Sequence, residues 1–132
     1  MADEHPGVSR VREYLDTFAA QDMDRLREFF ADDIVWHVAG DHPLSGDYRG
    51  KDALFDYFAR VREMTGGTLT LEPQSILASD NHTAMFTRVQ AQREGKQMDV
   101  VLAQAFDVGR DGRWTEYYAL ANDQAAVDAF WS

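Results

Sequence analysis

A pair of glycines, Gly66-Gly67, separates two parts of the chain that have different hydrophobic periodicities. Before the pair, apolar residues recur every three or four positions, which is typical of one face of an α-helix. After the pair, apolar and polar residues alternate, which is typical of strands with one buried face. Helices gathered early and strands gathered late favour an α+β fold, in which the helices cover one face of an antiparallel sheet.

The helical periodicity predicts three helices before the glycine pair and a short one late in the chain. They cover residues 8–19, a short segment after the candidate cap Asp22, residues 51–65 and residues 124–131. Ser9 is a candidate cap of the first helix, and Asn122-Asp123 of the last. Gly66 is expected to end the third helix, because glycine commonly occupies the position just past a helix C-terminus.

Four long strands are predicted after the glycine pair, at residues 69–78, 83–93, 97–108 and 113–121. Pro73 indicates an edge strand or a bulge, because proline cannot donate to a strand ladder. Glu94-Gly95-Lys96 predicts a tight hairpin connection. Strands of about ten residues exceed the usual five or six. With helices on one side, such strands are expected to curl into a cone whose apolar interior is a natural ligand cavity.

The segment 34–58 is where the sequence predicts a pocket, because a short apolar strand, a loop with glycine and proline, and a helix follow one another there. Trp36 and His37 lie near the end of the strand, and only one of the two can point inward because strand side chains alternate. In a cavity, His37 could move a proton or activate water, because imidazole titrates near neutrality. Alternatively, it is a strand histidine that bonds to backbone or faces solvent.

The composition excludes several classes of function. A net charge of −10 argues against nucleic acid as a partner, since phosphate binding needs clustered Lys and Arg, and against anionic membranes. The chain has no cysteine, which excludes disulfides, thiol catalysis and cysteine-ligated metals. The four histidines share no metal-ligand spacing, so we expect neither a metal nor a cofactor.

Length and hydropathy predict a single domain over residues 1–132. The polar, acidic N-terminus MADEHPGVSR predicts no signal peptide. No apolar run approaches the roughly 18 residues that a membrane span needs. We therefore expect a soluble, cytoplasmic protein.

Several short motifs carry a resemblance to a known superfamily. They are Tyr14, the junction Phe30-Ala31-Asp32-Asp33, the loop Gly40…Pro43…Gly46…Gly50, and Phe106-Asp107 followed by Asp111-Gly112-Arg113. Together with the order of elements, they resemble the nuclear transport factor 2-like superfamily, most of all its SnoaL-like polyketide cyclases and ketosteroid isomerases. The resemblance implies a cystatin-like α+β roll: a curved antiparallel sheet wrapped around the N-terminal helices to form a cone with an apolar cavity.

The catalytic residues of the ketosteroid isomerases are only partly matched. Tyr14 occupies the position of the isomerase tyrosine that donates to the developing oxyanion. Counting back from Gly40 places His37 at the position of the isomerase's aspartate base, whereas counting forward from Tyr14 places Val38 there. At the position of the protonated aspartate this chain has Leu102. Steroid isomerase activity is therefore not expected, and the superfamily hosts too many reactions for the fold to identify another.

The resemblance makes His37 the candidate catalytic base and Tyr14 the candidate oxyanion donor. Tyr14 could instead be a core tyrosine whose hydroxyl meets a backbone carbonyl. The resemblance implies that the side chains facing the cavity from the third long strand are those of Met98, Val100, Leu102, Gln104 and Phe106. Asp99 would then face outward. The expected substrate-binding residues are Phe18, Trp36, Tyr57, Phe58, Leu102, Gln104, Phe106 and Tyr117.

Two functions are compatible with these residues. The first is cofactor-free proton transfer, an isomerisation or cyclisation, on a small hydrophobic carbonyl compound in the cone. The second is a non-catalytic ligand-binding or dimerising module of the same fold. Asp41, His42 and Asp47 in the loop after the first strand could gate the cavity, although solvated turn chemistry explains them equally well.

The last strand also carries a prediction about partners. Trp114, Glu116 and Tyr118 are expected on the outer face of the sheet. Aromatic residues on an otherwise exposed face indicate burial against another protein surface. We therefore expect a homodimer that forms through this face.

Overall fold

The computed structural model describes residues 4–132 as a six-stranded curved sheet, four α-helices and one short 3-10 helix. Residues 1–3 belong to the N-terminal segment for which no signal peptide is predicted, and they lie outside the described residues. Within residues 4–132, no helix combines the length and the apolar character that crossing a membrane requires.

The predicted helices and long strands are all present, with bounds close to those expected. The helices are α1 (Pro6–Ala19), α2 (Met23–Leu26), η1 (Arg27–Phe29), α3 (Lys51–Thr65) and α4 (Gln124–Trp131). The strands are β1 (Phe30–Val38), β2 (Gly46–Arg49), β3 (Thr70–Ala78), β4 (His82–Arg93), β5 (Lys96–Val108) and β6 (Trp114–Ala121). Strand β2 was not predicted, because its four residues are too few to display an alternation.

The helix ends confirm most of the predicted caps. The carboxylates of Asp22 and Asp123 accept hydrogen bonds from backbone N–H groups in the first turns of α2 and α4. Gly66 ends α3 with a φ of 60°. The prediction for Ser9 was wrong, because α1 begins at Pro6 and the His5 imidazole accepts the capping hydrogen bond from the Gly7 N–H.

The sheet has the strand order β2-β1-β6-β5-β4-β3. All neighbours are antiparallel except β1 and β6, which run parallel, so the sheet is not purely antiparallel as expected. The register shifts between Pro73 and Ser75, which confirms a bulge at the proline. Glu94 and Gly95 form the hairpin connection with φ values of 49° and 78°.

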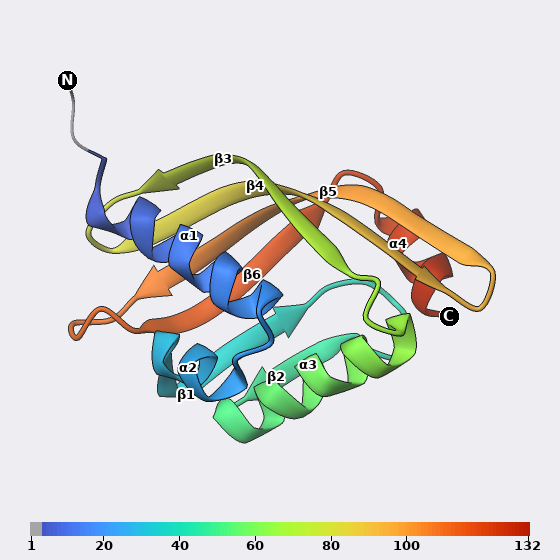
Figure 1. Ribbon diagram of the computed structural model, residues 1–132, viewed down its shortest axis with the longest axis horizontal. Helices are drawn as coiled ribbons and strands as arrows, with labels where there is room; N and C mark the ends of the chain where they lie inside the picture. Colours follow the sequence, from blue (N-terminus) through green and yellow to red (C-terminus); the bar gives the residue numbers. More distant parts are fainter. Residues whose placement is uncertain (1–3) are drawn as a thin grey trace.

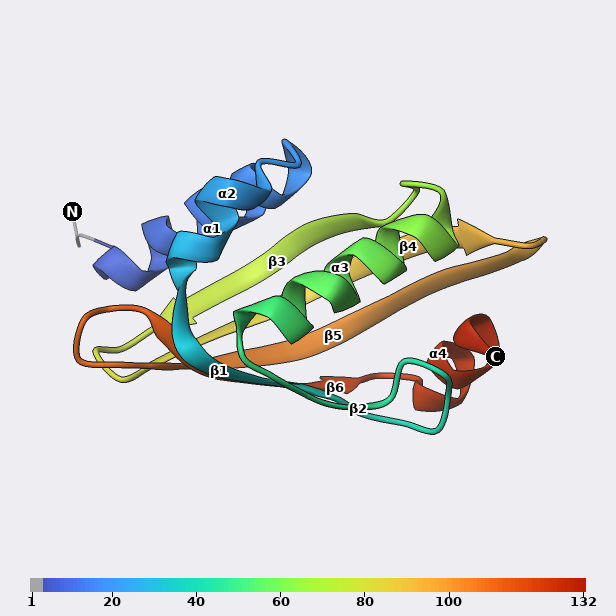
Figure 2. The same ribbon diagram turned by 90° about the horizontal axis from the view of Figure 1, so that it is seen from below.

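The helices lie on the inner side of the curved sheet, as Figures 1 and 2 show. Helix α1 packs on β3, α3 packs on β1 and β2, and α4 packs on β5 near one end of the sheet. The curved sheet and the helices α1 and α3 together enclose the cone. The opposite face of the sheet has no covering element (Figure 2).

The closed end of the cone is filled by an aromatic core. The Tyr14 ring makes edge-on contacts with Phe29, Phe30, Phe106 and Trp114 at centroid distances of 5.0–6.0 Å. The prediction that Trp114 lies on the outer face was wrong, since only 1% of it is exposed. The register shows the reason: Asp107 and Val108 pair with Glu116 and Trp114, so β6 contains an extra residue. Such a bulge reverses the alternation, and it turns Trp114 inward.

Replacing the inward tryptophan tests this account of the core. The substitution Trp114→Ala is expected to lower the free energy of unfolding by about 3–5 kcal/mol, because it leaves a cavity in a close-packed cluster. Urea denaturation followed by circular dichroism measures the change. Arg110→Ala, in the exposed turn before β6, is the control and is expected to change it by less than about 0.5 kcal/mol. A loss for Trp114→Ala as small as that of the control would contradict the inward placement.

Candidate ligand-binding site

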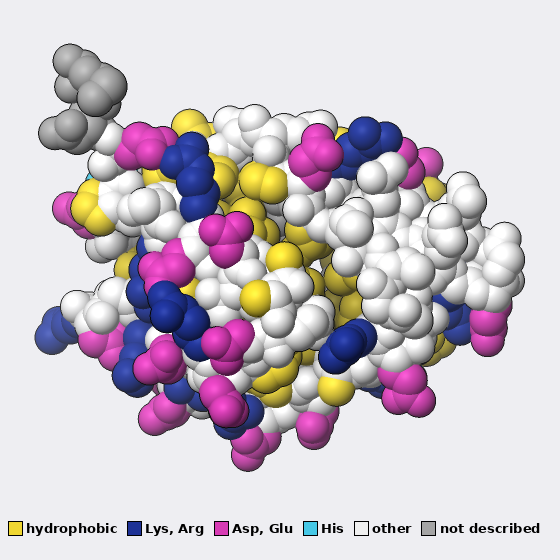
Figure 3. All heavy atoms as spheres, viewed as in Figure 1, with side chains coloured by type: hydrophobic (Ala, Val, Ile, Leu, Met, Phe, Trp, Pro, Cys, Tyr) yellow, Lys and Arg dark blue, Asp and Glu magenta, His cyan; other side chains and the backbone are white. Residues whose placement is uncertain are grey.

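A cavity of about 130 Å³ lies between the helices and the sheet. Residues from α1, α3, β1 and β3 to β6 form its walls, and α4 contributes Gln124, Val127 and Trp131 at one end. Figure 3 shows hydrophobic side chains at the bottom of a hollow on the helix-bearing face. Of the described residues that line the cavity, none is Asp, Glu, Lys or Arg. The cavity is therefore largely apolar, and its titratable lining residues are tyrosines and histidines.

Most of the expected binding residues line this cavity. They are Phe18, Trp36, Tyr57, Phe58, Leu102, Gln104 and Tyr117, and the two expected catalytic residues, Tyr14 and His37, border the cavity as well. Phe106 is the exception, because it is fully buried in the aromatic core and stacks on Trp114 with centroids 4.1 Å apart. It faces inward as expected, but it lies at the closed end of the cone, where the core leaves no space.

The structure places Trp36, and not His37, on the inner face. Trp36 is 5% exposed and stacks on Tyr117, with ring centroids 3.5 Å apart and planes at 15°. The two residues are paired in the register between β1 and β6, so the stack lies across the parallel strand pair. It forms a flat aromatic wall at the cavity.

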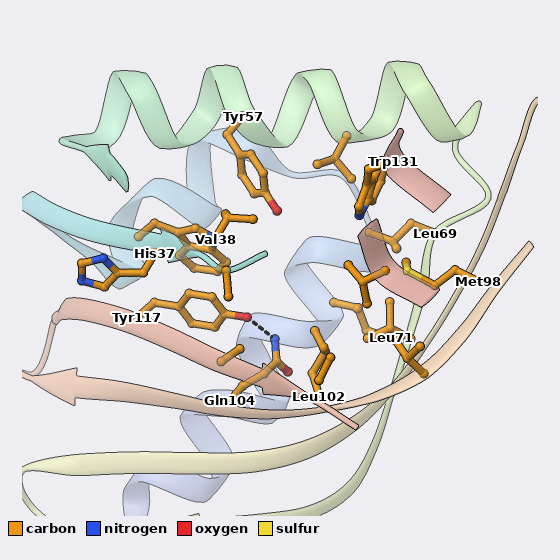
Figure 4. Close-up of a pocket in the computed structure, with 18 of the residues that line it drawn as sticks. His37, Val38, Tyr57, Leu69, Leu71, Met98, Leu102, Gln104, Tyr117 and Trp131 are labelled. Atoms are coloured by element: carbon orange, nitrogen blue, oxygen red, sulfur yellow. Dashed lines mark hydrogen bonds between the residues drawn. The ribbon is translucent and has the colours of Figure 1, made fainter. Parts of the chain in front are cut away.

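The His37 imidazole consequently points away from the cavity, as Figure 4 shows. Its Nδ1 lies 2.6 Å from Asp47 Oδ1, and its Nε2 lies 2.6 Å from Glu116 Oε2. These hydrogen bonds, first to Asp47 and then to Glu116, raise the pKa of His37 above its ordinary value of 6.5. Both ring nitrogens are engaged outside the cone, so this geometry does not favour His37 as a base for a ligand inside it.

A small group of polar atoms lies inside the otherwise apolar cavity. Gln104 Nε2 donates a hydrogen bond to the Tyr117 hydroxyl at 2.6 Å. Gln104 is only 7% exposed, and its Oε1 has no hydrogen-bond partner among residues 4–132. The Tyr57 hydroxyl projects from α3 into the cavity toward this pair (Figure 4). We call Gln104, Tyr57 and Tyr117 the polar group of the cavity.

The tyrosines around the cavity are neutral hydrogen-bond donors at physiological pH. Burial raises the pKa of Tyr117 to about 12, against the opposing effect of its hydrogen bond with Gln104. Burial is also the largest cause of the raised pKa of Tyr57 and of Tyr14, whose pKa lies well above its usual value. Tyr14 therefore retains the protonated hydroxyl that an oxyanion donor needs.

His42 belongs to the loop for which gating of the cavity and solvated turn chemistry were the two alternatives, and it lines the cavity. Its side chain is fully buried. Its Nδ1 accepts from the Leu44 N–H at 3.2 Å, and its Nε2 donates to the Ala39 carbonyl at 3.1 Å. Both ring nitrogens are therefore used by the loop itself, so His42 has no free lone pair for a ligand.

Helix α4 is the part of the site that the sequence did not identify. Gln124 and the Asp41 N–H both donate to Asp128 Oδ1, which ties α4 to the loop before β2. This contact depends on Gly40, because a Cβ there would collide with the Asp128 and Gln124 side chains. The alternation of apolar residues could have assigned Leu69 and Leu71 to the cavity lining. No local sequence pattern indicates that α4 packs against the end of the cavity.

Within residues 4–132, no group of three or more His, Cys, Asp and Glu side chains is arranged to hold a metal ion.

Comparisons with known proteins agree with this architecture. A family model described as a SnoaL-like domain matches residues 11–117. The uncharacterized protein Rv0034 of Mycobacterium tuberculosis is 33% identical over 125 residues, which cover 92% of this chain and 93% of that protein.

Two solved structures extend the similarity to the fold. Bal32a, from a soil-derived mobile gene cassette, is 31% identical and superposes with a TM-score of 0.90, covering 96% of each chain. A protein of unknown function with a cystatin-like fold from Xanthomonas campestris is 22% identical, with a TM-score of 0.89 over 97% of this chain and 99% of that one. The predicted α+β roll is thereby confirmed.

The contacts of His37 generate a prediction about pH. Because the pKa of His37 is raised in the folded protein, its stabilising contribution is complete below the unfolded value and is lost as pH rises through the folded pKa. Wild type should therefore exceed His37→Gln in unfolding free energy at about pH 5.5, and the difference should shrink toward about pH 9. Urea denaturation at several pH values measures it. His82→Gln, at an exposed histidine, controls for removal of an imidazole, and a difference independent of pH would contradict the assigned contacts.

Proposed function

The chain belongs to the family of SnoaL-like domains, and we propose that it binds a small, largely apolar molecule in its cone. One observation carries the proposal: a largely apolar cavity of about 130 Å³ lined mainly by aliphatic and aromatic side chains. The hollow is open to solvent, and covering its apolar lining with a ligand gains about 25 cal/mol per Å² of apolar surface, which favours an apolar occupant over an under-filled core.

Binding without catalysis is the function that the side chains support best. Proton transfer needs a base that reaches the ligand. His37 points outside the cone, His42 uses both nitrogens on the backbone, and the tyrosines hold their protons. The alternative, cofactor-free proton transfer with His37 as base and Tyr14 as oxyanion donor, would require the His37 ring to leave two carboxylates and cross to the inner face. We therefore propose the binding function ahead of that reaction.

Filling the cavity is the direct test of binding. Toluene is expected to raise the melting temperature of the wild-type protein, because a ligand that binds only the folded state stabilises it. Ala119→Leu places an isobutyl group in the cavity and should abolish this shift. Ala59→Leu adds the same group on an exposed position of α3 and should leave it unchanged.

Thermal unfolding with and without toluene, together with a binding isotherm from calorimetry, measures both effects. Equal shifts of the melting temperature in Ala119→Leu and Ala59→Leu would show that toluene binds outside the cavity. Absence of any shift in the wild type would reject the cavity as a binding site for apolar molecules.

We also propose that a second copy of the chain covers the outer face of the sheet. Four large apolar side chains are exposed there: Leu77, Phe86, Tyr118 and Leu120. The strand registers align them in two cross-strand rows, because Phe86 pairs with Ala103 and Ala103 pairs with Leu120, while Leu77 reaches Tyr118 through Ala84 and Ala105. An apolar patch that crosses four strands is typical of an interaction surface, and a flat sheet face can pack on itself about a two-fold axis.

A charge placed in the patch tests this proposal. Leu120, which is 75% exposed, can be replaced by Lys without disturbing the interior. Sedimentation velocity is expected to give a dimer for the wild type and a monomer for Leu120→Lys, because an unpaired charge at the interface is costly to desolvate. Ala59→Lys adds the same charge on α3 and should remain dimeric. A monomeric wild type would contradict the proposal.

A further inference from the structure

We infer that the ligand of the cone carries a hydroxyl group, an alcohol or a phenol, that donates to Gln104 Oε1 and accepts from the Tyr117 hydroxyl. The inference rests on the proposed function, because it concerns the same cavity. It replaces the carbonyl compound expected from the sequence with a different chemical class.

Gln104 supplies the acceptor. Its side chain projects from β5 into the cavity, where it is more than nine-tenths buried. Its Nε2 donates a hydrogen bond to the Tyr117 hydroxyl at 2.6 Å. Its Oε1 is buried without a partner among the described residues. A buried carbonyl oxygen without a partner is costly, and it is relieved by a ligand that offers an O–H donor.

Tyr117 supplies a matching donor. Because its oxygen accepts the hydrogen bond from Gln104 Nε2, its own proton is not used in that bond. Stacking on Trp36 holds the ring in place. The Tyr57 hydroxyl faces the same space from α3 and offers a second donor (Figure 4). The polar group of the cavity therefore presents one acceptor beside two donors.

A hydroxyl is the smallest ligand group that complements this arrangement. It donates once and accepts through two lone pairs, so it can serve Gln104 and the tyrosines together. A ketone or aldehyde accepts only, and it would leave Gln104 Oε1 unpaired. A carboxylate would bring a negative charge into a lining that has neither Lys nor Arg among the described residues.

The size of the cavity limits the rest of the ligand. An apolar cavity of about 150 Å³ in another protein binds benzene. The present cavity, about 130 Å³, suits a body of roughly one ring. Leu71, Met98, Leu102 and Trp131 form the apolar wall that such a ring would contact (Figure 4).

The experiment compares three probes that share one aromatic body. They are p-cresol with a hydroxyl, p-tolualdehyde with a carbonyl, and toluene with neither. Two additional hydrogen bonds relative to toluene, and one relative to p-tolualdehyde, which leaves Gln104 Oε1 unpaired, should make p-cresol bind the wild-type protein about 10-fold more tightly than either. Calorimetry or an NMR titration gives the three dissociation constants.

Variants of two glutamines assign the preference to a single side chain. Gln104→Leu should lower the affinity for p-cresol about 10-fold and leave that for toluene within about 2-fold. Gln97→Leu makes the same change at an exposed position of β5 outside the cavity lining and should keep the preference. Should Gln104→Leu fail to fold, Tyr117→Phe removes the donor instead and should also reduce the preference.

The outcomes separate this inference from the proposed function. If toluene binds but p-cresol has no advantage over it or over p-tolualdehyde, the hydroxyl inference is overturned while the apolar site stands. A preference that survives both Gln104→Leu and Tyr117→Phe also overturns it. If none of the three probes binds, the proposed function fails and the inference fails with it.

Discussion

The contact on which the cone depends is the stack of Trp36 on Tyr117 across the parallel strands β1 and β6. It joins the helical part of the chain to the four long strands that follow it. Since Trp36 takes the inner face, the alternation of β1 sends His37 outward to the carboxylates of Asp47 and Glu116. The same stack orients the Tyr117 hydroxyl toward Gln104. One aromatic pair thereby decides which polar groups a ligand in the cavity can meet.

Local periodicity predicted nearly all the elements, because each helix and long strand carries its own apolar face. What it could not predict depends on residues far apart in sequence. The four residues of β2 have no pattern of their own and exist only as a partner of β1. Trp114 was assigned to the wrong face because a bulge interrupts the alternation of β6. The inward faces of β5 and β6 were otherwise predicted well, so Leu102, Gln104 and Tyr117 were found from the sequence and its resemblance to a family.

The cavity combines features that separate binding from catalysis. Its donors are tyrosines that burial keeps protonated, and its acceptor is an uncharged amide. The two histidines nearest to it are each committed to other partners. A site of this kind suits the shape and hydrogen-bonding capacity of a neutral molecule. The ketosteroid isomerase pattern fails here at the positions where that chemistry needs carboxyl groups.

Helix α4 has a consequence for how relatives of this protein can diverge. Its eight residues close one end of the cavity, but they lie outside the segment 11–117 that matches the family. They are attached by polar contacts to Asp41, by the close approach at Gly40 and by the burial of Phe130 and Trp131 against β4 and β5, and not by strand pairing. The end wall can therefore lengthen, shorten or change its side chains while the sheet keeps its register. The end wall is thus encoded in a stretch of the gene separate from the one that encodes the strands and the polar group of the cavity.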